Sequence, residues 1–192
     1  MRLYRSTAAS AAVIGLLLAS GADAHVFGEH AGGIYAGTAH PFTGLDHLLA
    51  TIAIGMWAAQ GNVRSAWAVA VSFVAAMAAG SVLALGGFAL PHVEAGVAAS
   101  VLVLGLFVAL AVRLPLVAGV ALSGAFALFH GYAHGAELPN MGSPFAYAVG
   151  FLLATALLTA TGCTAGRMLN ARLLRVAGLC VAAAGAAFLA TA

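Results

Sequence analysis

Six long apolar segments, separated by short polar breaks, fill the chain from residue 44 to its end. We place them near residues 44–60, 65–90, 93–112, 115–136, 144–166 and 172–191. A helix that crosses a bilayer needs about 20 mostly apolar residues, so each segment can span a membrane. Of the 192 residues, 64% are hydrophobic and only 6% are charged, which excludes a soluble enzyme, a nucleic-acid binder and a disordered chain. We predict an all-α, polytopic membrane helix bundle of six transmembrane helices, with the lipid bilayer as its surroundings.

The first 24 residues have the pattern of a secretory signal peptide. Arg2 and Arg5 precede an apolar stretch, residues 8–19, and small residues follow as far as Ala24. This stretch is too short to span a bilayer. We expect cleavage after residue 24, which leaves residues 25–192 as a single six-span domain with residues 25–43 as an external N-terminal segment. The alternative is an uncleaved first helix.

Positive charge falls in alternate loops. With an external N-terminus, the cytoplasmic loops hold all the arginines of the mature chain: Arg64, Arg113, Arg167, Arg172 and Arg175. This distribution follows the positive-inside rule and gives the same orientation as the signal peptide. The first and fourth spans then run in opposite directions, which is compatible with an inverted repeat of three spans. The oligomeric state stays open, a homo-oligomer included.

Two histidine-rich blocks lie at the ends of spans. Ionisable side chains in spans are costly and are by default candidates for a functional site. The first block leads into span one and the second closes span four; they contain His40, Asp46 and His47, and His130, His134 and Glu137. Because both blocks lie at the outer level of the membrane, we expect them to meet.

The spacing within the second block favours a metal site. His130, His134 and Glu137 lie at positions i, i+4 and i+7, on one face of a helix. Two imidazoles one turn apart can bind a single divalent transition metal ion. Imidazole together with carboxylate favours Ni, Co, Zn, Fe or Cu.

The first block has a different geometry. Asp46 and His47 are adjacent and point about 100° apart on a helix, so we expect Asp46 to hold an imidazole tautomer rather than to share the ion. His40 precedes Pro41, and we expect it at the end of an extended or re-entrant segment.

The external segment contains two further histidines. His25 and His30 flank Glu29 and would either capture metal or form a solvated stretch. After the expected cleavage, the free amine and the imidazole of His25 would form a natural chelate.

At these residues the chain resembles the HupE/UreJ family of small bacterial membrane proteins. The resemblance rests on the signal peptide, the six spans and the two histidine blocks, and it covers the whole mature chain. It implies uptake of nickel, or cobalt, across the bacterial cytoplasmic (inner) membrane, which supplies hydrogenase or urease maturation. It further implies that the metal-selecting residues are His40, Asp46, His47, His130, His134 and Glu137. The first block is also similar to the HxxxxDH signature of nickel–cobalt permeases, but five residues separate His40 from Asp46, which argues against membership of that family.

The same residues leave other functions open. A secondary, non-ATP importer is the main hypothesis, because no nucleotide-binding motif is present. The alternative is a membrane-embedded metallohydrolase, in which the His/Asp/Glu cluster holds a catalytic Zn²⁺ with an open water position. A bis-His haem carrier, using His47 with His130 or His134, is the second rival.

Overall fold

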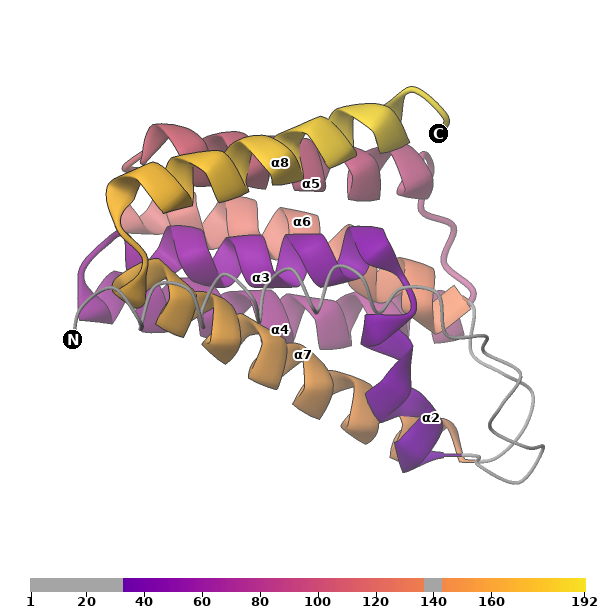
Figure 1. Cartoon of the computed structure of the whole chain (residues 1–192). Helices are drawn as coiled ribbons and strands as arrows, with labels where there is room; N and C mark the ends of the chain where they lie inside the picture. Colours follow the sequence, from indigo (N-terminus) through magenta and orange to yellow (C-terminus); the bar gives the residue numbers. More distant parts are fainter. Residues whose placement is uncertain (1–32, 137–142) are drawn as a thin grey trace. The chain divides into compact units, whose positions relative to one another are not determined.

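The computed structural model describes residues 33–136 and 143–192, and the regular structure in these ranges is helical (Figure 1). The described helices are α2 (Ile34–Ala39), the 3-10 helix η1 (His40–Phe42), α3 (Leu45–Ala59), α4 (Val63–Leu85), α5 (Val93–Leu110), α6 (Leu116–Ala136), α7 (Pro144–Met168) and α8 (Ala171–Leu189). The prediction of an all-helical membrane bundle is confirmed. The predicted signal peptide lies outside the described residues and stays a prediction.

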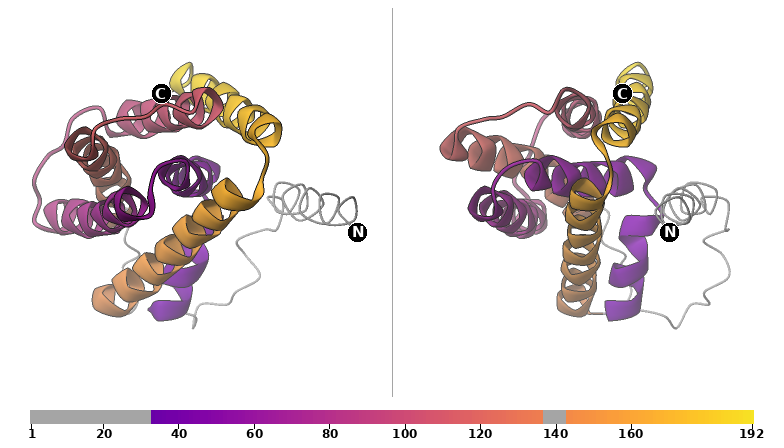
Figure 2. Two further views of the ribbon diagram at one scale, coloured as in Figure 1. Left: turned by 90° about the vertical axis from the view of Figure 1, so that its left-hand side faces the viewer. Right: turned by 60° about the vertical axis from the view of Figure 1, so that its left-hand side comes forward.

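Five helices, α4 to α8, are long and apolar enough to cross a membrane by themselves. The first predicted span, near residues 44–60, differs from these five. Its main part, α3, has 15 residues and reaches spanning length only together with the α2–η1 segment, from which it is bent by 81°. The described part of the predicted external segment is therefore helical, and it packs along the start of α7 (Figure 2).

Local sequence sets where the spans begin and end. The side chains of Asn62, Ser143 and Asn170 each accept a hydrogen bond from a backbone N–H in the first turn of α4, α7 and α8. The end of α4 comes earlier than the predicted residue 90. The reason is a turn at Gly86 and Gly87, in which Gly87 has a φ of 74° that suits glycine.

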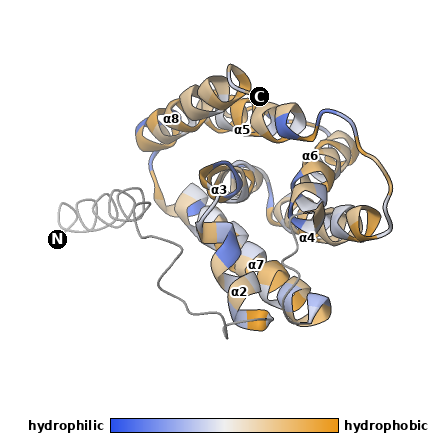
Figure 3. Ribbon diagram, turned by 90° about the vertical axis from the view of Figure 1, so that its right-hand side faces the viewer, coloured by the Kyte–Doolittle hydropathy of each residue, from blue (hydrophilic) through white to orange (hydrophobic). Residues whose placement is uncertain are grey.

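The helix α3 lies in the middle of the bundle, surrounded by the other spans (Figure 3). Ten of its 15 residues are buried, whereas the surrounding helices expose large apolar side chains such as Val117, Leu153 and Leu110. Exposed apolar side chains on long hydrophobic helices suit a lipid environment. The central position of α3 brings its first turn, which carries the first histidine block, into the interior of the bundle.

The spans associate in three close pairs: α3 with α7, α4 with α6, and α5 with α8. Glycines allow each approach. A Cβ atom on Gly55 would overlap the backbone of Thr159, one on Gly131 would overlap the backbone of Met77, and one on Gly105 would overlap Ala182. Small residues at such crossings let helix backbones come close together in a membrane.

The three pairs have the symmetry of a repeat in which α3, α4 and α5 correspond to α6, α7 and α8. Under this correspondence the α3–α7 pair is equivalent to the α6–α4 pair, and the α5–α8 pair is equivalent to itself. Gly162 lies against Ile52, and Gly80 lies against Leu128. Leu128 follows Ile52 by as many residues as Gly131 follows Gly55. The α3–α7 and α4–α6 crossings therefore have the same register. The α5–α8 pair is reciprocal: Gly105 lies against Ala182 and Gly178 lies against Ala109, again with one common offset. These contacts support the inverted repeat that the topology suggested.

Candidate metal site

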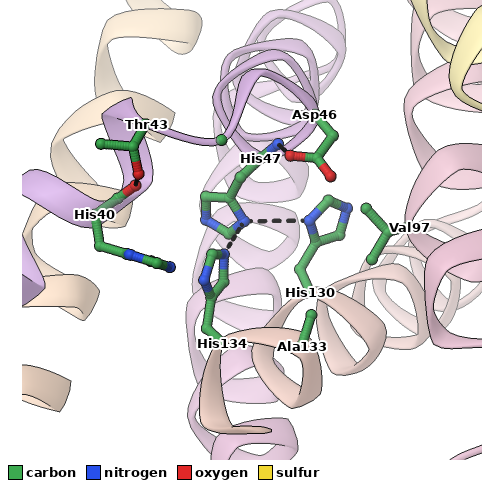
Figure 4. Close-up of a pocket in the computed structure, with 9 residues that line it drawn as sticks. His40, Thr43, Asp46, His47, Val97, His130, Ala133 and His134 are labelled. Atoms are coloured by element: carbon green, nitrogen blue, oxygen red, sulfur yellow. Dashed lines mark hydrogen bonds between the residues drawn. The ribbon is translucent and has the colours of Figure 1, made fainter. Parts of the chain in front are cut away.

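The two histidine blocks meet inside the bundle, as the sequence predicts. His47 lies in the first turn of α3, and His130 and His134 lie one turn apart near the end of α6. The Nδ1 atom of His47 is 3.2 Å from Nδ1 of His130 and 2.7 Å from Nε2 of His134 (Figure 4). Three imidazoles from distant parts of the chain therefore bring nitrogen atoms to one point.

These imidazoles are buried, with exposed fractions of 1% for His47 and His130 and 7% for His134. They line a pocket of about 210 Å³. The pocket is lined by His40, Thr43, Gly44, Asp46, His47, Val97, His130, Ala133 and His134. His40 comes from η1, and its ring centre is 4.6 Å from that of His134. A fourth imidazole thus joins the three central ones.

The conformation at His40 is not the extended one that the sequence offers, whereas the 81° bend between the α2–η1 segment and α3 is compatible with the re-entrant alternative. His40 has φ −55° and ψ −45°, which is helical, although a following proline disfavours this region. Pro41 occupies the first turn of η1, where its missing N–H is not needed, and the N–H of Thr43 closes the turn on the His40 carbonyl. The chain bends instead at Gly44, whose extended conformation separates η1 from α3.

Ser100 holds His130 in one orientation, and sequence reasoning missed this residue. Its hydroxyl is 2.7 Å from Nε2 of His130 and 2.6 Å from the carbonyl oxygen of Val97. Because a serine has one hydroxyl proton, which the Val97 carbonyl accepts, Ser100 accepts the Nε2 proton of His130. A neutral His130 then presents the lone pair of Nδ1 to the pocket. A hydroxyl inside an apolar span is the signal that could have pointed to Ser100.

Asp46 lines the pocket but makes its hydrogen bond elsewhere. Its Oδ1 atom accepts from the backbone N–H of His47 at 2.7 Å, in the first turn of α3. Glycine at the preceding N-cap position offers no side chain for this purpose. Asp46 therefore stabilises the start of α3 through the backbone, whereas the sequence predicts that it holds an imidazole.

The nitrogen geometry decides how well the cluster suits a metal ion. Two imidazoles bound to one ion at about 2.0–2.1 Å have nitrogens roughly 3.0–3.4 Å apart. The His47–His130 distance of 3.2 Å fits this range, whereas the His47–His134 distance of 2.7 Å is that of a hydrogen bond. As they stand, the described residues contain no group of three or more His, Cys, Asp or Glu with metal-site geometry. Metal binding would require the His47–His134 hydrogen bond to open by a few tenths of an ångström.

Two ring nitrogens of this cluster, Nε2 of His47 and Nδ1 of His134, are buried without a hydrogen-bond partner. Buried polar atoms of this kind are uncommon and are found at sites that bind ions or water. Three further predicted site residues, His25, His30 and Glu137, lie outside the described residues, and their roles stay predictions.

Comparison with known proteins gives a consistent result. The family model described as HupE / UreJ protein matches residues 11–188. Protein HupE from Rhizobium leguminosarum bv. viciae is 44% identical over 178 residues, which cover 91% of this chain and 93% of that protein. No solved structure matches the chain. The chain is a multi-pass membrane protein that belongs to the HupE/UreJ family.

Proposed function

We propose that this protein is a secondary importer of divalent nickel, or of cobalt, in the bacterial inner membrane. The observation that carries the proposal is the convergence of three buried imidazoles, His47, His130 and His134, at one end of a membrane-embedded bundle. Imidazole ligands suit nickel and cobalt, and no thiolate lines the pocket. His40 and Asp46 would complete the site at its open side, and Glu137, His25 and His30 would capture the ion from outside.

The charge distribution supports an external position for the histidine pocket. The pocket lies at the starts of α3 and η1 and at the end of α6. The exposed arginines lie at the opposite ends of the spans: Arg64, Arg113, Arg167, Arg172 and Arg175. If arginine marks the cytoplasmic side, the imidazoles face the periplasm, together with the N-terminus of the mature chain.

The membrane potential provides enough free energy for this import. Two positive charges that move inward across about 100 mV gain about 4.6 kcal/mol, at about 2.3 kcal/mol per charge. At about 1.4 kcal/mol per tenfold ratio, this gain corresponds to an accumulation of roughly 2,000-fold. A uniporter therefore suffices, with no nucleotide and no coupled proton. The imported metal would supply hydrogenase or urease maturation.

Nickel uptake by cells that lack their own nickel importers tests the proposal. Cells expressing the wild-type chain should accumulate radioactive nickel, with cobalt as the competing ion. His47→Ala and His130→Ala should abolish uptake at matched membrane expression. His92→Ala is the control, because His92 is exposed and does not line the pocket.

Two results would contradict the importer. The first is uptake no greater than that of empty-vector cells from protein that is present in the membrane and loaded with metal. In that case the zinc metallohydrolase becomes the better account of the same cluster. The second is uptake that survives both histidine substitutions, which would place the transported ion elsewhere.

A further inference from the structure

Two buried threonines differ from all the others that the structure describes. The hydroxyls of Thr51 and Thr155 are buried and have no hydrogen-bond partner, and both residues are 0% exposed. Each remaining described threonine donates its hydroxyl to a backbone carbonyl three or four residues earlier: Thr38, Thr43, Thr159, Thr161, Thr164 and Thr191. A threonine inside any helix can make this hydrogen bond. A buried hydroxyl without a partner costs free energy, so this pair calls for a physical reason.

The helix register places both threonines one turn beyond residues that contact each other at the histidine cluster. Thr51 follows His47 by one turn on α3, and Thr155 follows Phe151 by one turn on α7. The rings of His47 and Phe151 are in contact, with centres 5.4 Å apart. The two helices cross while running in the same general direction, because Ile52 lies against Gly162 and Met56 lies against Gly166 (Figure 1). Thr51 and Thr155 therefore each lie one helical turn, about 6 Å along its own helix, beyond a ring of this contact and toward the crossing of α3 with α7.

A second pocket lies at the other end of α3. It measures about 430 Å³ and is lined by Trp57, Ala58 and Gln60, among others. The Nε2 atom of Gln60 donates to the Val108 carbonyl at 2.9 Å, while its Oε1 atom is buried without a partner. Along α3 the distance from Thr51 to Ala58 is about 10 Å. Ile54, which is 0% exposed, lies between them and closes this stretch with an apolar side chain.

The two pockets are counterparts in the inverted repeat. Trp57 and Ala58 line the second pocket, and Ala133 and His134 line the histidine pocket. The number of residues from Trp57 to Ala133, and from Ala58 to His134, is the same as the number from Gly55 to Gly131 at the equivalent helix crossings. In transporters built from inverted repeats, the two sides open alternately around a site near the middle. Thr51 and Thr155 lie between the histidine pocket and the apolar stretch at Ile54, and this stretch separates the histidine pocket from the second pocket.

We propose that Thr51 and Thr155 form an oxygen site for the divalent cation on its inward path. This inference rests on the proposed function and adds the step that follows release from the imidazoles. The two hydroxyl oxygens bind the cation together with its remaining water molecules. Neutral hydroxyls are weaker nickel ligands than imidazoles, and a conducting path needs sites weak enough for the ion to leave. A hydroxyl already bonded to a backbone carbonyl would be less available for this role.

Valine substitutions test the proposal, because valine has the shape of threonine without the hydroxyl. The variants are Thr51→Val and Thr155→Val, with Thr159→Val as the control. Thr159 is 2% exposed and lies on the same helix as Thr155, but its hydroxyl is bonded to the Thr155 carbonyl. Nickel binding to the purified full chain and the nickel uptake rate in cells are measured for each. Thermal unfolding in detergent checks that the variants fold, and Thr51→Ser and Thr155→Ser check that the hydroxyl is the group required.

We expect Thr51→Val and Thr155→Val to bind nickel with wild-type affinity, because the imidazoles are intact, and to import it at least tenfold more slowly. The serine variants and Thr159→Val should keep most of the wild-type rate. Wild-type uptake by both Thr51→Val and Thr155→Val would overturn the oxygen site and leave the proposed function standing. Loss of nickel binding in either variant would also overturn it, since the hydroxyl would then belong to the histidine site. Absence of uptake by the wild-type chain would overturn the proposed function and this step with it.

Discussion

Replacing Ser100 with alanine should weaken nickel binding while leaving all four imidazoles of the pocket in place. Ser100 lies on α5, is 0% exposed, and accepts the Nε2 proton of His130 across 2.7 Å. This hydrogen bond directs the Nδ1 lone pair of His130 toward His47. The substitution therefore tests whether Ser100 sets the tautomer of His130, one of the imidazoles proposed to bind the metal.

The expected loss follows from what the variant leaves unpaired. In Ser100→Ala, a metal-bound His130 keeps its proton on Nε2, buried and without an acceptor, at a cost of about 1–3 kcal/mol. In the metal-free protein the proton can move to Nδ1 and be donated to His47, which is 3.2 Å away. Most of the cost therefore falls on the metal-bound state. Removal of such supporting partners lowers metal affinity about 10–100-fold, which corresponds to about 1.4–2.8 kcal/mol.

Equilibrium nickel binding to the detergent-purified full chain is the assay. Ser123→Ala is the matched control, because Ser123 is also 0% exposed and donates to a backbone carbonyl, that of Val69, but does not line the histidine pocket. Binding should weaken 10–100-fold in Ser100→Ala and stay unchanged in Ser123→Ala. Equal affinities for Ser100→Ala and the wild type would refute the role assigned to Ser100.

Three further perturbations address the fold, the capping carboxylate and the driving force. Gly131→Ala should lower the stability of the purified protein by about 1–3 kcal/mol, because the added Cβ atom overlaps the Met77 backbone. Gly124→Ala, on the same helix, is the control: its added Cβ atom would meet Ala76 at 3.8 Å, so this variant should unfold at the wild-type temperature. Asp46→Asn keeps an oxygen for the His47 N–H but removes the charge, so it should preserve thermal stability and weaken nickel binding, and unchanged affinity would show that the charge is irrelevant. Collapse of an imposed potential of about 100 mV in proteoliposomes should remove the roughly 2,000-fold nickel accumulation, whereas accumulation that persists would require another energy source.

The membrane fold could be predicted from the sequence because it depends on local properties of the chain. Each span must contain enough consecutive apolar residues to cross the bilayer, and the breaks between spans carry Pro, Gly, Asn or arginine. The histidine blocks were also visible, because an ionisable side chain at a span is costly and therefore rare. Their meeting followed from topology alone: the start of span one and the end of span four share one membrane level.

Other features depend on how the helices cross, which local sequence does not encode. The 81° bend before α3 separates it from the α2–η1 segment, although the apolar run of the first predicted span resembles those of the other spans. Asp46 could have bonded to an imidazole or to the backbone, and its first-turn position in α3 decided for the backbone N–H of His47. Ser100 became a partner of His130 only because α5 passes beside the end of α6.

The threonines show the division most clearly. Thr155 and Thr159 are the same residue type, one turn apart on one helix, yet one hydroxyl is bonded to a backbone carbonyl and the other has no partner. Composition and spacing cannot separate them, since both lie in one apolar run. The sequence by itself determined the spans and the residue types available for metal binding. Only the tertiary structure decided which polar atoms lie together in the interior, because that depends on the close approach of α3 to α7 and of α4 to α6 at their glycines.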